Sequence, residues 1–465
     1  MRKAAERLAR IEQICRERLG ITMTHRTLGL VRKIFFSVAF VEWLQLLWIR
    51  SISFTLPDPL AGFLICALLV ASASMVLGFR LRATSILNYL LVLIVLHFTR
   101  DHYHVDHLYL GMSFCFLFVP TQKSQESESV PIWFFFLLFL QIGLVYADSI
   151  VYKYGCIVWK SGTIFWLASA LPPLSYGNFP DWAESQLVVK TLTYTALGLE
   201  TVFPLILLPL FRKPLWAIGL GLHIGITLLF PIPLFGLAVS AVYLIFLDML
   251  RTSSKPEASS SETASGQHAP HLVLGWTLVV ALIVSQSLIT LYRIWEGSRP
   301  GLQWVYKANQ LATKVTGISN NSVYVDNHFL VKRPFLRFQV LPAGKTGSID
   351  IPSFQPNGYP KFPEVTGRIW ALNGFYLRGP SFDKMSTMWI DYVRSWCKLK
   401  RIPLDKSEVQ VLYLEVTPTL DTLDFGYDDR IENANWQEAG NFVFEGSKVR
   451  NIRWSTGFRA LYPKF

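Results

Sequence analysis

Four ionisable side chains lie within or at the ends of long apolar stretches: Lys153, Glu200, His107 and His223. An ionisable group inside a bilayer costs about 2.5–3.5 kcal/mol on insertion scales, so such groups usually face a polar interior. Desolvation favours a neutral lysine amine, and a neutral amine can act as a general base. We therefore expect a buried polar pocket in which Lys153 is the base.

Structural roles for the same residues remain open. Lys153 ends an apolar run, and from such a position a lysine can extend its amine to the membrane surface. Glu200 can pack or cap through another helix, and a lone histidine such as His223 is more often a satisfied core residue. Because an unpaired carboxylate in lipid is costly, we predict that Glu200 has a polar partner from another apolar segment.

A second polar segment, RDHYHVDHLYLG at residues 100–111, contains three histidines and two aspartates. Zinc binds such side chains, but His102 and His107 are five residues apart and do not share the i,i+4 face of a helix, so we predict no metal. An active-site loop and a polar loop at the membrane interface remain open. An apolar run follows His107, so we expect its ring to point inward.

The composition indicates a membrane protein. The 465 residues are 51% hydrophobic and 16% charged, whereas soluble domains have about 25% charged residues. The net charge of +12 suits nucleic acid or an anionic membrane surface, and the apolar runs favour membrane lipids as the partner over nucleic acid. The five cysteines form no CxxC pair, which excludes a zinc ribbon and a disulfide-stapled miniprotein.

Apolar runs of about 20 residues can cross a hydrocarbon core of about 30 Å. The predicted fold class is a membrane all-α helical bundle of about nine passes plus a C-terminal, mainly β extracytoplasmic domain with one helix near 383–399. In that domain the runs FLRFQVLP, GRIWALNGFYLRG, VQVLYLEV and NFVFEG alternate with period two and predict strands. The nine runs lie at residues 34–54, 57–79, 84–100, 107–120, 131–151, 190–210, 214–230, 232–249 and 271–294. The run at 107–120 is short for a span, so we expect it to be tilted or re-entrant.

Basic residues concentrate on one side of this arrangement, which the positive-inside rule assigns to the cytoplasm. The last segment then lies outside, in the periplasm, at the cell exterior or in the ER lumen, where Asn320 would be a glycosylation sequon in a eukaryote. Along the chain we predict a basic amphipathic cytoplasmic N-terminus at 1–33, a transmembrane bundle at 34–250, a cytoplasmic linker at 251–270, a last transmembrane helix at 271–294 and the extracytoplasmic domain at 295–465.

A known family shares several of these features. The frame Y-x6-K-x5-W-x2-G is made by Tyr146, Lys153, Trp159 and Gly162. It resembles the frame of the horizontally transferred transmembrane domain family, whose best-known enzymes are the vitamin K-dependent gamma-carboxylases. DHLYLGMSFCF at 106–116, LHIGITLLFPIPLFGLAV at 222–239 and stretches at 391–416 and 428–436 are similar to further family segments. The resemblance covers most of residues 34–465.

The resemblance implies a reaction and roles for individual residues. Lys153 matches the lysine that deprotonates reduced vitamin K, and His107 matches a histidine thought to assist the carbon dioxide and carbanion stage. The reduced quinone would be oxygenated to its epoxide, coupled to carboxylation of a protein glutamate, with oxygen and carbon dioxide as co-substrates and no metal. The implied substrate or quinone pocket contains Asp106, His223, Glu200, Tyr146 and Trp159.

Asp106 departs from the family pattern, in which an asparagine engages the quinone. A carboxylate would repel a developing hydroquinone anion unless it is protonated or paired with a nearby histidine. Two other functional classes also remain open. One is a non-catalytic membrane factor for the maturation or export of a secreted peptide. The other is a transporter, which the lack of symmetric halves and the large one-sided domain disfavour. For an enzyme, the expected partners are a lipophilic quinone and a glutamate-containing protein.

Overall fold

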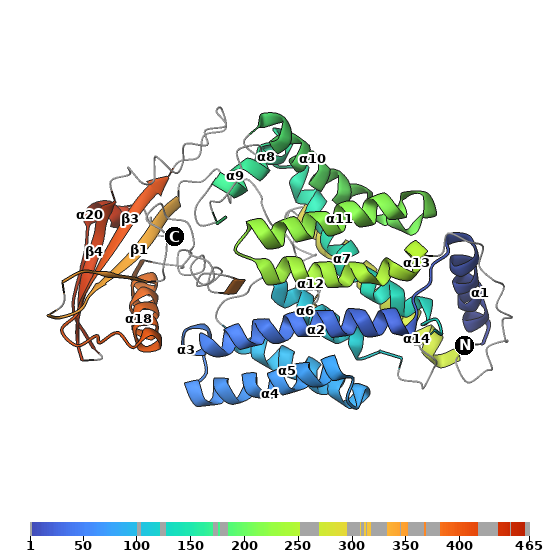
Figure 1. Ribbon diagram of the computed structural model, residues 1–465, viewed down its shortest axis with the longest axis horizontal. Coiled ribbons are helices and arrows are strands. Elements are labelled where there is room, and N and C mark those ends of the chain that lie inside the picture. Colours follow the sequence, from blue (N-terminus) through green and yellow to red (C-terminus); the bar gives the residue numbers. More distant parts are fainter. Residues whose placement is uncertain are drawn as a thin grey trace.

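The computed structural model describes residues 2–99, 104–120, 127–170, 175–176, 185–251, 269–294, 307, 311–312, 314–317, 333–344, 346–351, 367–368, 382–416, 436–446 and 448–460. This part of the chain is mostly helical. A bundle of long helices occupies most of the molecule, and an antiparallel sheet lies at one end of it (Figure 1).

The long helices are α1 (Arg2–Leu19), α2 (His25–Trp48), α4 (Asp58–Leu77), α5 (Leu81–Phe98), α6 (His104–Phe116), α7 (Ile132–Lys153), α10 (Gln186–Val202), α11 (Pro209–Leu229), α12 (Pro233–Tyr243) and α14 (Ala269–Ile294). The short ones are α3 (Arg50–Ser53), α8 (Ile157–Lys160), α9 (Ile164–Ala170), η2 (Phe203–Leu207), η3 (Leu244–Phe246) and α13 (Leu247–Arg251). Local sequence explains several ends. Thr24 caps α2 by accepting a hydrogen bond from the Thr27 amide, and Gly78 ends α4 with a left-handed φ of 74°.

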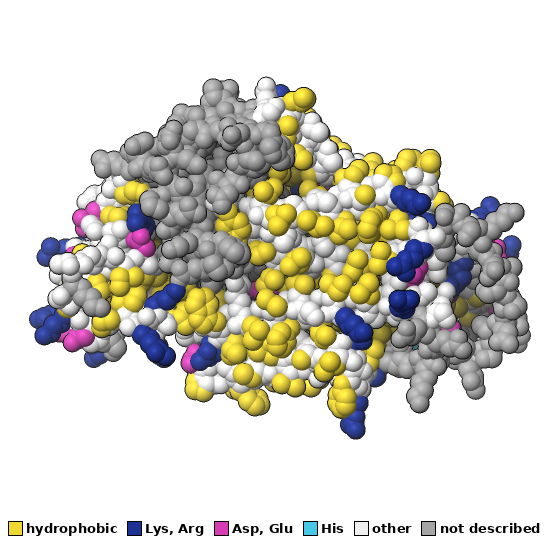
Figure 2. Space-filling view, viewed as in Figure 1, with side chains coloured by type: hydrophobic (Ala, Val, Ile, Leu, Met, Phe, Trp, Pro, Cys, Tyr) yellow, Lys and Arg dark blue, Asp and Glu magenta, His cyan; other side chains and the backbone are white. Residues whose placement is uncertain are grey.

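Within the described residues, five helices are long and apolar enough to cross a membrane, at 58–77, 81–98, 132–153, 233–251 and 270–288. Their exposed sides are apolar as well: Phe63 is 68% exposed and Val70 is 66% exposed. A helix of a soluble bundle would carry polar residues on that face, whereas a lipid-facing helix carries apolar ones. Hydrophobic side chains accordingly cover the middle of the bundle (Figure 2).

The predicted count of nine passes is not supported. The run at 107–120 forms a helix of only 13 residues and the run at 190–210 one of 17 residues before it turns into the 3-10 helix η2, and both are short for a span. The helix over 34–54, α2, begins earlier than predicted and includes several charged residues, and α11 includes Arg212 and Lys213. These helices complete the bundle without meeting the length and hydropathy of a candidate span.

Basic side chains join loops at one end of the bundle. Arg212 donates hydrogen bonds to the carbonyls of Leu19, at 2.5 Å, and Met249, at 3.1 Å, while Arg82 donates to the Leu117 carbonyl. In Figure 1, α1 lies across this end and the sheet lies at the opposite end. Lys and Arg side chains line the edge of the apolar band near α1 in Figure 2. Basic side chains therefore gather at the end of the bundle near α1 (Figure 2).

The C-terminal sheet has the strand order β2-β1-β3-β4-β5, with all neighbours antiparallel. Its elements are β1 (Arg333–Leu341), β2 (Ile349–Ile351), α18 (Phe382–Lys400), β3 (Glu408–Val416), β4 (Gln437–Glu445), β5 (Lys448–Trp454) and α20 (Thr456–Ala460). The strands predicted from FLRFQVLP, VQVLYLEV and NFVFEG are confirmed as β1, β3 and β4, and the predicted helix is α18. The strand expected from GRIWALNGFYLRG lies outside the described residues except for Gly367 and Arg368, which are helical.

Alternation along β3 buries Val409 and Val411 against the aromatic face of α18, where Trp389 and Trp396 are almost fully buried. The same apolar cluster includes Ile49 and Ile52 at the end of α2 and in α3. The sheet region therefore packs directly on the bundle.

Candidate functional site

Lys153 and Glu200 form a buried ion pair in the bundle. The Lys153 Nζ atom lies 2.5 Å from Glu200 Oε1 and 2.6 Å from Oε2, and it stands 4.4 Å from the centroid of the Trp159 ring. Lys153 is only 5% exposed and Glu200 only 9%. The amine therefore does not extend to the surface, and the predicted polar partner of Glu200 from another helix is confirmed.

Local structure explains the frame around the lysine. Tyr146 and Lys153 are both buried residues of α7, two turns apart, so they lie on the same side of the helix. The chain turns after α7, and the short helix α8 brings the Trp159 ring over the amine. Gly162 has a φ of 74°, and a Cβ there would come within 2.9 Å of the Lys190 side chain on α10. Glycine thus allows this turn to pack against the helix that carries Glu200.

Three further side chains form a hydrogen-bonded chain beside this pair. The Tyr146 hydroxyl lies 2.5 Å from His223 Nε2 and 3.0 Å from the Tyr243 hydroxyl. These residues come from α7, α11 and α12 respectively, and all three are buried. Gly219 makes the arrangement possible, because a Cβ at this position of α11 would collide with the Tyr243 hydroxyl.

The ion pair and the hydrogen-bonded chain are neighbours. Lys153 is close enough to His223, and Glu200 to Tyr146 and Tyr243, for their charges to act on these groups. We call this set the lysine cluster; it consists of Lys153, Glu200, Trp159, Tyr146, His223 and Tyr243. Sequence reasoning missed Tyr243. A usable signal was present, because a tyrosine inside the apolar run SAVYLIF needs a partner for its hydroxyl.

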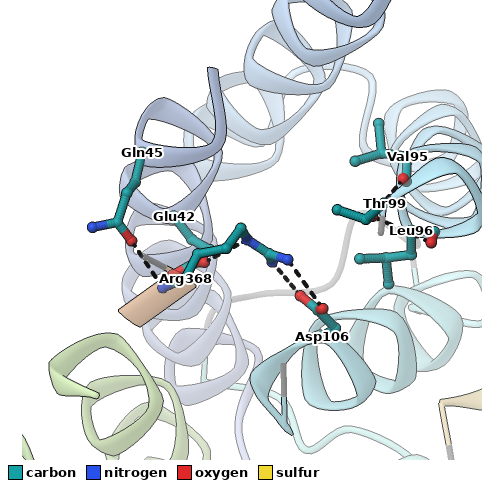
Figure 3. A network of polar contacts seen from close by, with 7 residues as sticks. All are labelled: Glu42, Gln45, Val95, Leu96, Thr99, Asp106 and Arg368. Atoms are coloured by element: carbon teal, nitrogen blue, oxygen red, sulfur yellow. Dashed lines mark hydrogen bonds and ion pairs between the residues drawn. The ribbon is translucent and has the colours of Figure 1, made fainter. Parts of the chain in front are cut away.

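Asp106 belongs to a second polar cluster, shown in Figure 3. Arg368 donates from Nη1 to Asp106 Oδ2 at 3.2 Å and from Nη2 to Asp106 Oδ1, and its Nε donates to Glu42 Oε1 at 3.0 Å. The Gln45 side chain accepts a hydrogen bond from the Arg368 amide at 3.4 Å. Arg368, Glu42 and Asp106 are at most 1% exposed. We call these four residues the arginine cluster.

The arginine cluster shows how the negative charge of Asp106 is balanced. The Asp106 carboxylate forms an ion pair with Arg368. Arg368 is separated from Asp106 by 262 residues, so no local pattern could have predicted the pairing. The neighbouring Gly367 amide donates to the Pro231 carbonyl at 2.6 Å, which anchors this short C-terminal segment between α2, α6 and the α11–α12 turn.

His107 follows Asp106 on α6 and is partly buried. The Lys153 amine contacts Glu200 and the Trp159 ring, and His107 belongs to a different helix, α6. His102 lies outside the described residues, as does Asn320. In the described part of the chain, no group of three or more His, Cys, Asp or Glu side chains is placed to hold a metal ion.

Comparison of the chain with known protein families, with characterised proteins and with solved structures finds no match.

Proposed function

We propose that this chain is a membrane enzyme of the vitamin K-dependent gamma-carboxylase type, in which Lys153 deprotonates a lipophilic hydroquinone. The observation that carries the proposal is the buried Lys153–Glu200 pair, held under the Trp159 ring inside an apolar bundle. Intramembrane ionisable groups are costly and mark functional sites. The frame of residues around Lys153 adds the resemblance to the horizontally transferred transmembrane domain family.

The pairing with Glu200 suits a base. A lysine must be neutral to accept a proton, and a carboxylate at 2.5 Å can take the proton that the amine releases. The Lys153 amine could then remove the hydroxyl proton of a reduced quinone, with Glu200 as the proton store.

The reaction that the resemblance implies balances as follows. The hydroquinone and one O2 give the quinone epoxide and water, so that the quinol and oxygen supply the redox change between them. A basic oxygen formed on this path removes a proton from the γ-carbon of a protein glutamate, and that carbon bonds to carbon dioxide. A dry bundle interior protects such a base from water. In this proposal His107 acts at the second stage, and the sheet region faces the extracytoplasmic side with the protein substrate.

A non-catalytic membrane factor is the second candidate, and one observation favours it. In both buried clusters each charged side chain meets one of opposite charge: Lys153 pairs with Glu200, and Arg368 pairs with Glu42 and Asp106. A purely structural role would require the same pairing. On this alternative the bundle is a scaffold for the maturation or export of a secreted peptide, and the lysine cluster only holds α7, α10, α11 and α12 together.

The test is an assay of the purified full chain with reduced vitamin K and oxygen, followed for epoxide with and without a glutamate peptide. We expect Lys153→Ala to abolish epoxide formation and Lys153→Arg not to restore it, because a guanidinium stays protonated. Lys160→Ala, which changes an exposed lysine on α8, is the matched control and should be active. Full quinol-dependent activity in a correctly folded Lys153→Ala protein would contradict the role of Lys153 as the base and would favour the non-catalytic membrane factor.

A further inference from the structure

In Figure 1, helix α1 runs across the end of the bundle, and hydrogen bonds fix it to the start of α7. Glu12 Oε1 accepts a hydrogen bond from the Trp133 amide at 3.3 Å, and Arg16 Nη2 donates to the Val130 carbonyl at 3.1 Å. The candidate span 132–153 begins beside these contacts. A helix that runs crosswise at the end of a span lies parallel to the bilayer surface, at the depth of the lipid headgroups.

One side of α1 covers the bundle. Its residues recur every three or four positions, which places them on one face of the helix: Ala5, Leu8, Glu12, Cys15 and Leu19. Ala5 is 7% exposed and the other four are half-buried, and Cys15 and Leu19 pack against the core of the bundle. This face explains how α1 is attached, but it leaves the residues on the other sides of the helix without a role.

A second side of α1 combines apolar and basic residues that are all exposed. Successive members of this side are four, three and four residues apart, so they form one stripe about three turns long: Arg7, Ile11, Ile14 and Arg18. Ile11 is 43% exposed and Ile14 is 45% exposed. Among the described residues, neither arginine has a carboxylate partner. We call these four residues the arginine–isoleucine face.

The other flank of α1 is acidic and polar. Glu6, Gln13 and Glu17 are exposed there, and Gln13 Nε2 donates to Glu17 Oε1 at 2.8 Å. An anionic membrane surface repels such carboxylates, whereas it suits both residue types of the arginine–isoleucine face. A guanidinium makes paired hydrogen bonds to a phosphate, and an aliphatic side chain enters the boundary between headgroups and acyl chains. The two flanks are therefore matched to lipid and to water respectively.

Further positive charge surrounds α1. Arg212 Nη2 donates to the Leu19 carbonyl at the end of α1 at 2.5 Å, and the next residue, Lys213, is exposed. Arg212 Nη1 donates to the Met249 carbonyl at 3.1 Å, and Arg251, two residues further on, is exposed at the end of α13. Figure 2 shows Lys and Arg side chains along this edge of the apolar band. Basic residues at this depth attract anionic headgroups.

We propose that the arginine–isoleucine face of α1 lies in the headgroup layer of the membrane and binds anionic phospholipids. Arg7 and Arg18 hold phosphate groups at the two ends of the stripe, and Ile11 and Ile14 insert between the acyl chains of the same lipids. The surface joins α1, and through Glu12 the start of α7, to the bilayer. It goes beyond the proposed function and does not depend on any reaction in the lysine cluster.

The first measurement is the depth of α1, by electron paramagnetic resonance of the full chain in lipid nanodiscs. A nitroxide label is attached at Ile14→Cys or, as the matched control on the acidic flank, at Gln13→Cys, each combined with Cys15→Ser and Cys66→Ser. Oxygen concentrates in lipid, whereas an uncharged nickel complex stays in water. We expect oxygen to relax the label at residue 14 more than nickel does, and the reverse at residue 13. Relaxation dominated by nickel at both positions would overturn the proposal.

The second measurement tests the headgroup, with nanodiscs of phosphatidylcholine alone or mixed with phosphatidylglycerol. In the mixed lipids, we expect Arg7→Gln with Arg18→Gln to lower the ratio of immersed to water-exposed label at residue 14 by about 5-fold for each arginine. Arg450→Gln with Arg453→Gln removes two exposed arginines of β5, at the opposite end of the molecule, and should keep the wild-type ratio.

Two outcomes of these measurements count against anionic lipid. An equal ratio in the two lipid compositions, with no effect of the Arg7 and Arg18 substitutions, would overturn the proposal. A disulfide-linked dimer of unlabelled Ile14→Cys, formed in the mixed lipids, would assign the face to a second copy of the chain and would overturn it as well.

Discussion

The two buried polar clusters differ in the way their charges are balanced. In the lysine cluster one amine meets one carboxylate, and both come from helices of the bundle. In the arginine cluster one guanidinium lies between two carboxylates, and it comes from a segment near the C-terminal sheet region. A lysine can give up its proton, whereas an arginine remains charged. The first cluster therefore suits proton transfer, and the second suits a permanent tie between bundle and C-terminal segment.

Removal of Arg368 should have the largest effect on stability. Arg368→Met leaves Glu42 and Asp106 buried without their shared cation, and breaking a buried pair in this way costs about 3–5 kcal/mol. Thermal unfolding in detergent measures the loss. Arg394→Ala is the control, because the Arg394–Asp391 pair on α18 is 38% and 45% exposed and should contribute about 0–1 kcal/mol. Equal effects of the two substitutions would refute the role of Arg368 as a tie.

Replacement of both members of the lysine pair should separate stability from activity. Lys153→Met or Glu200→Leu alone orphans a buried charge and should cost about 3–5 kcal/mol, whereas the double substitution restores an uncharged interior and should recover most of that loss. Unfolding measurements on the three variants form a double-mutant cycle. We expect the double variant to fold and to form no epoxide. An active double variant would remove this pair from the chemistry.

Gly219→Ala should have an intermediate effect. The new Cβ would collide with the Tyr243 hydroxyl and push it away from Tyr146, at a cost of about 1–3 kcal/mol in unfolding free energy. Gly221 lies on the same helix with open space around it, so Gly221→Ala should be neutral or slightly stabilising. A destabilisation by Gly221→Ala as large as that by Gly219→Ala would show that helix propensity or lipid contact, rather than the hydroxyl, decides the result.

The smallest effect is expected on the fold of the sheet region when Arg368 is replaced. Burial raises the pKa of the Cys397 thiol on α18 to about 12, so maleimide at pH 8 should label it very slowly in the folded protein. We expect the same slow labelling in Arg368→Met, because the core around Trp396 and Val411 does not depend on that arginine. Rapid labelling in this variant would mean that Arg368 holds the sheet fold itself, rather than its attachment.

Local patterns predicted much of the fold. Alternating apolar residues identified β1, β3 and β4, and the helix predicted near 383–399 is α18. The apolar runs identified the bundle, but of the nine predicted spans only five correspond to helices of the described residues with the length and hydropathy of a span. Hydropathy alone cannot tell a helix that crosses a membrane from a shorter helix packed among its neighbours. The composition indicated a membrane protein, and the five long apolar helices of the described residues are compatible with one.

Sequence by itself also showed that Glu200 needed a polar partner, since the cost of a buried carboxylate is independent of the fold. Only the tertiary structure decided that this partner is Lys153, that Tyr243 joins His223 through Tyr146, and that Arg368 neutralises Asp106. In sequence, Lys153 and Glu200 are 47 residues apart, Tyr146 and Tyr243 are 97 apart, and Asp106 and Arg368 are 262 apart. Periodicity records which face of a helix is buried, but the choice among distant partners depends on how whole helices pack, and no local stretch of sequence contains that information.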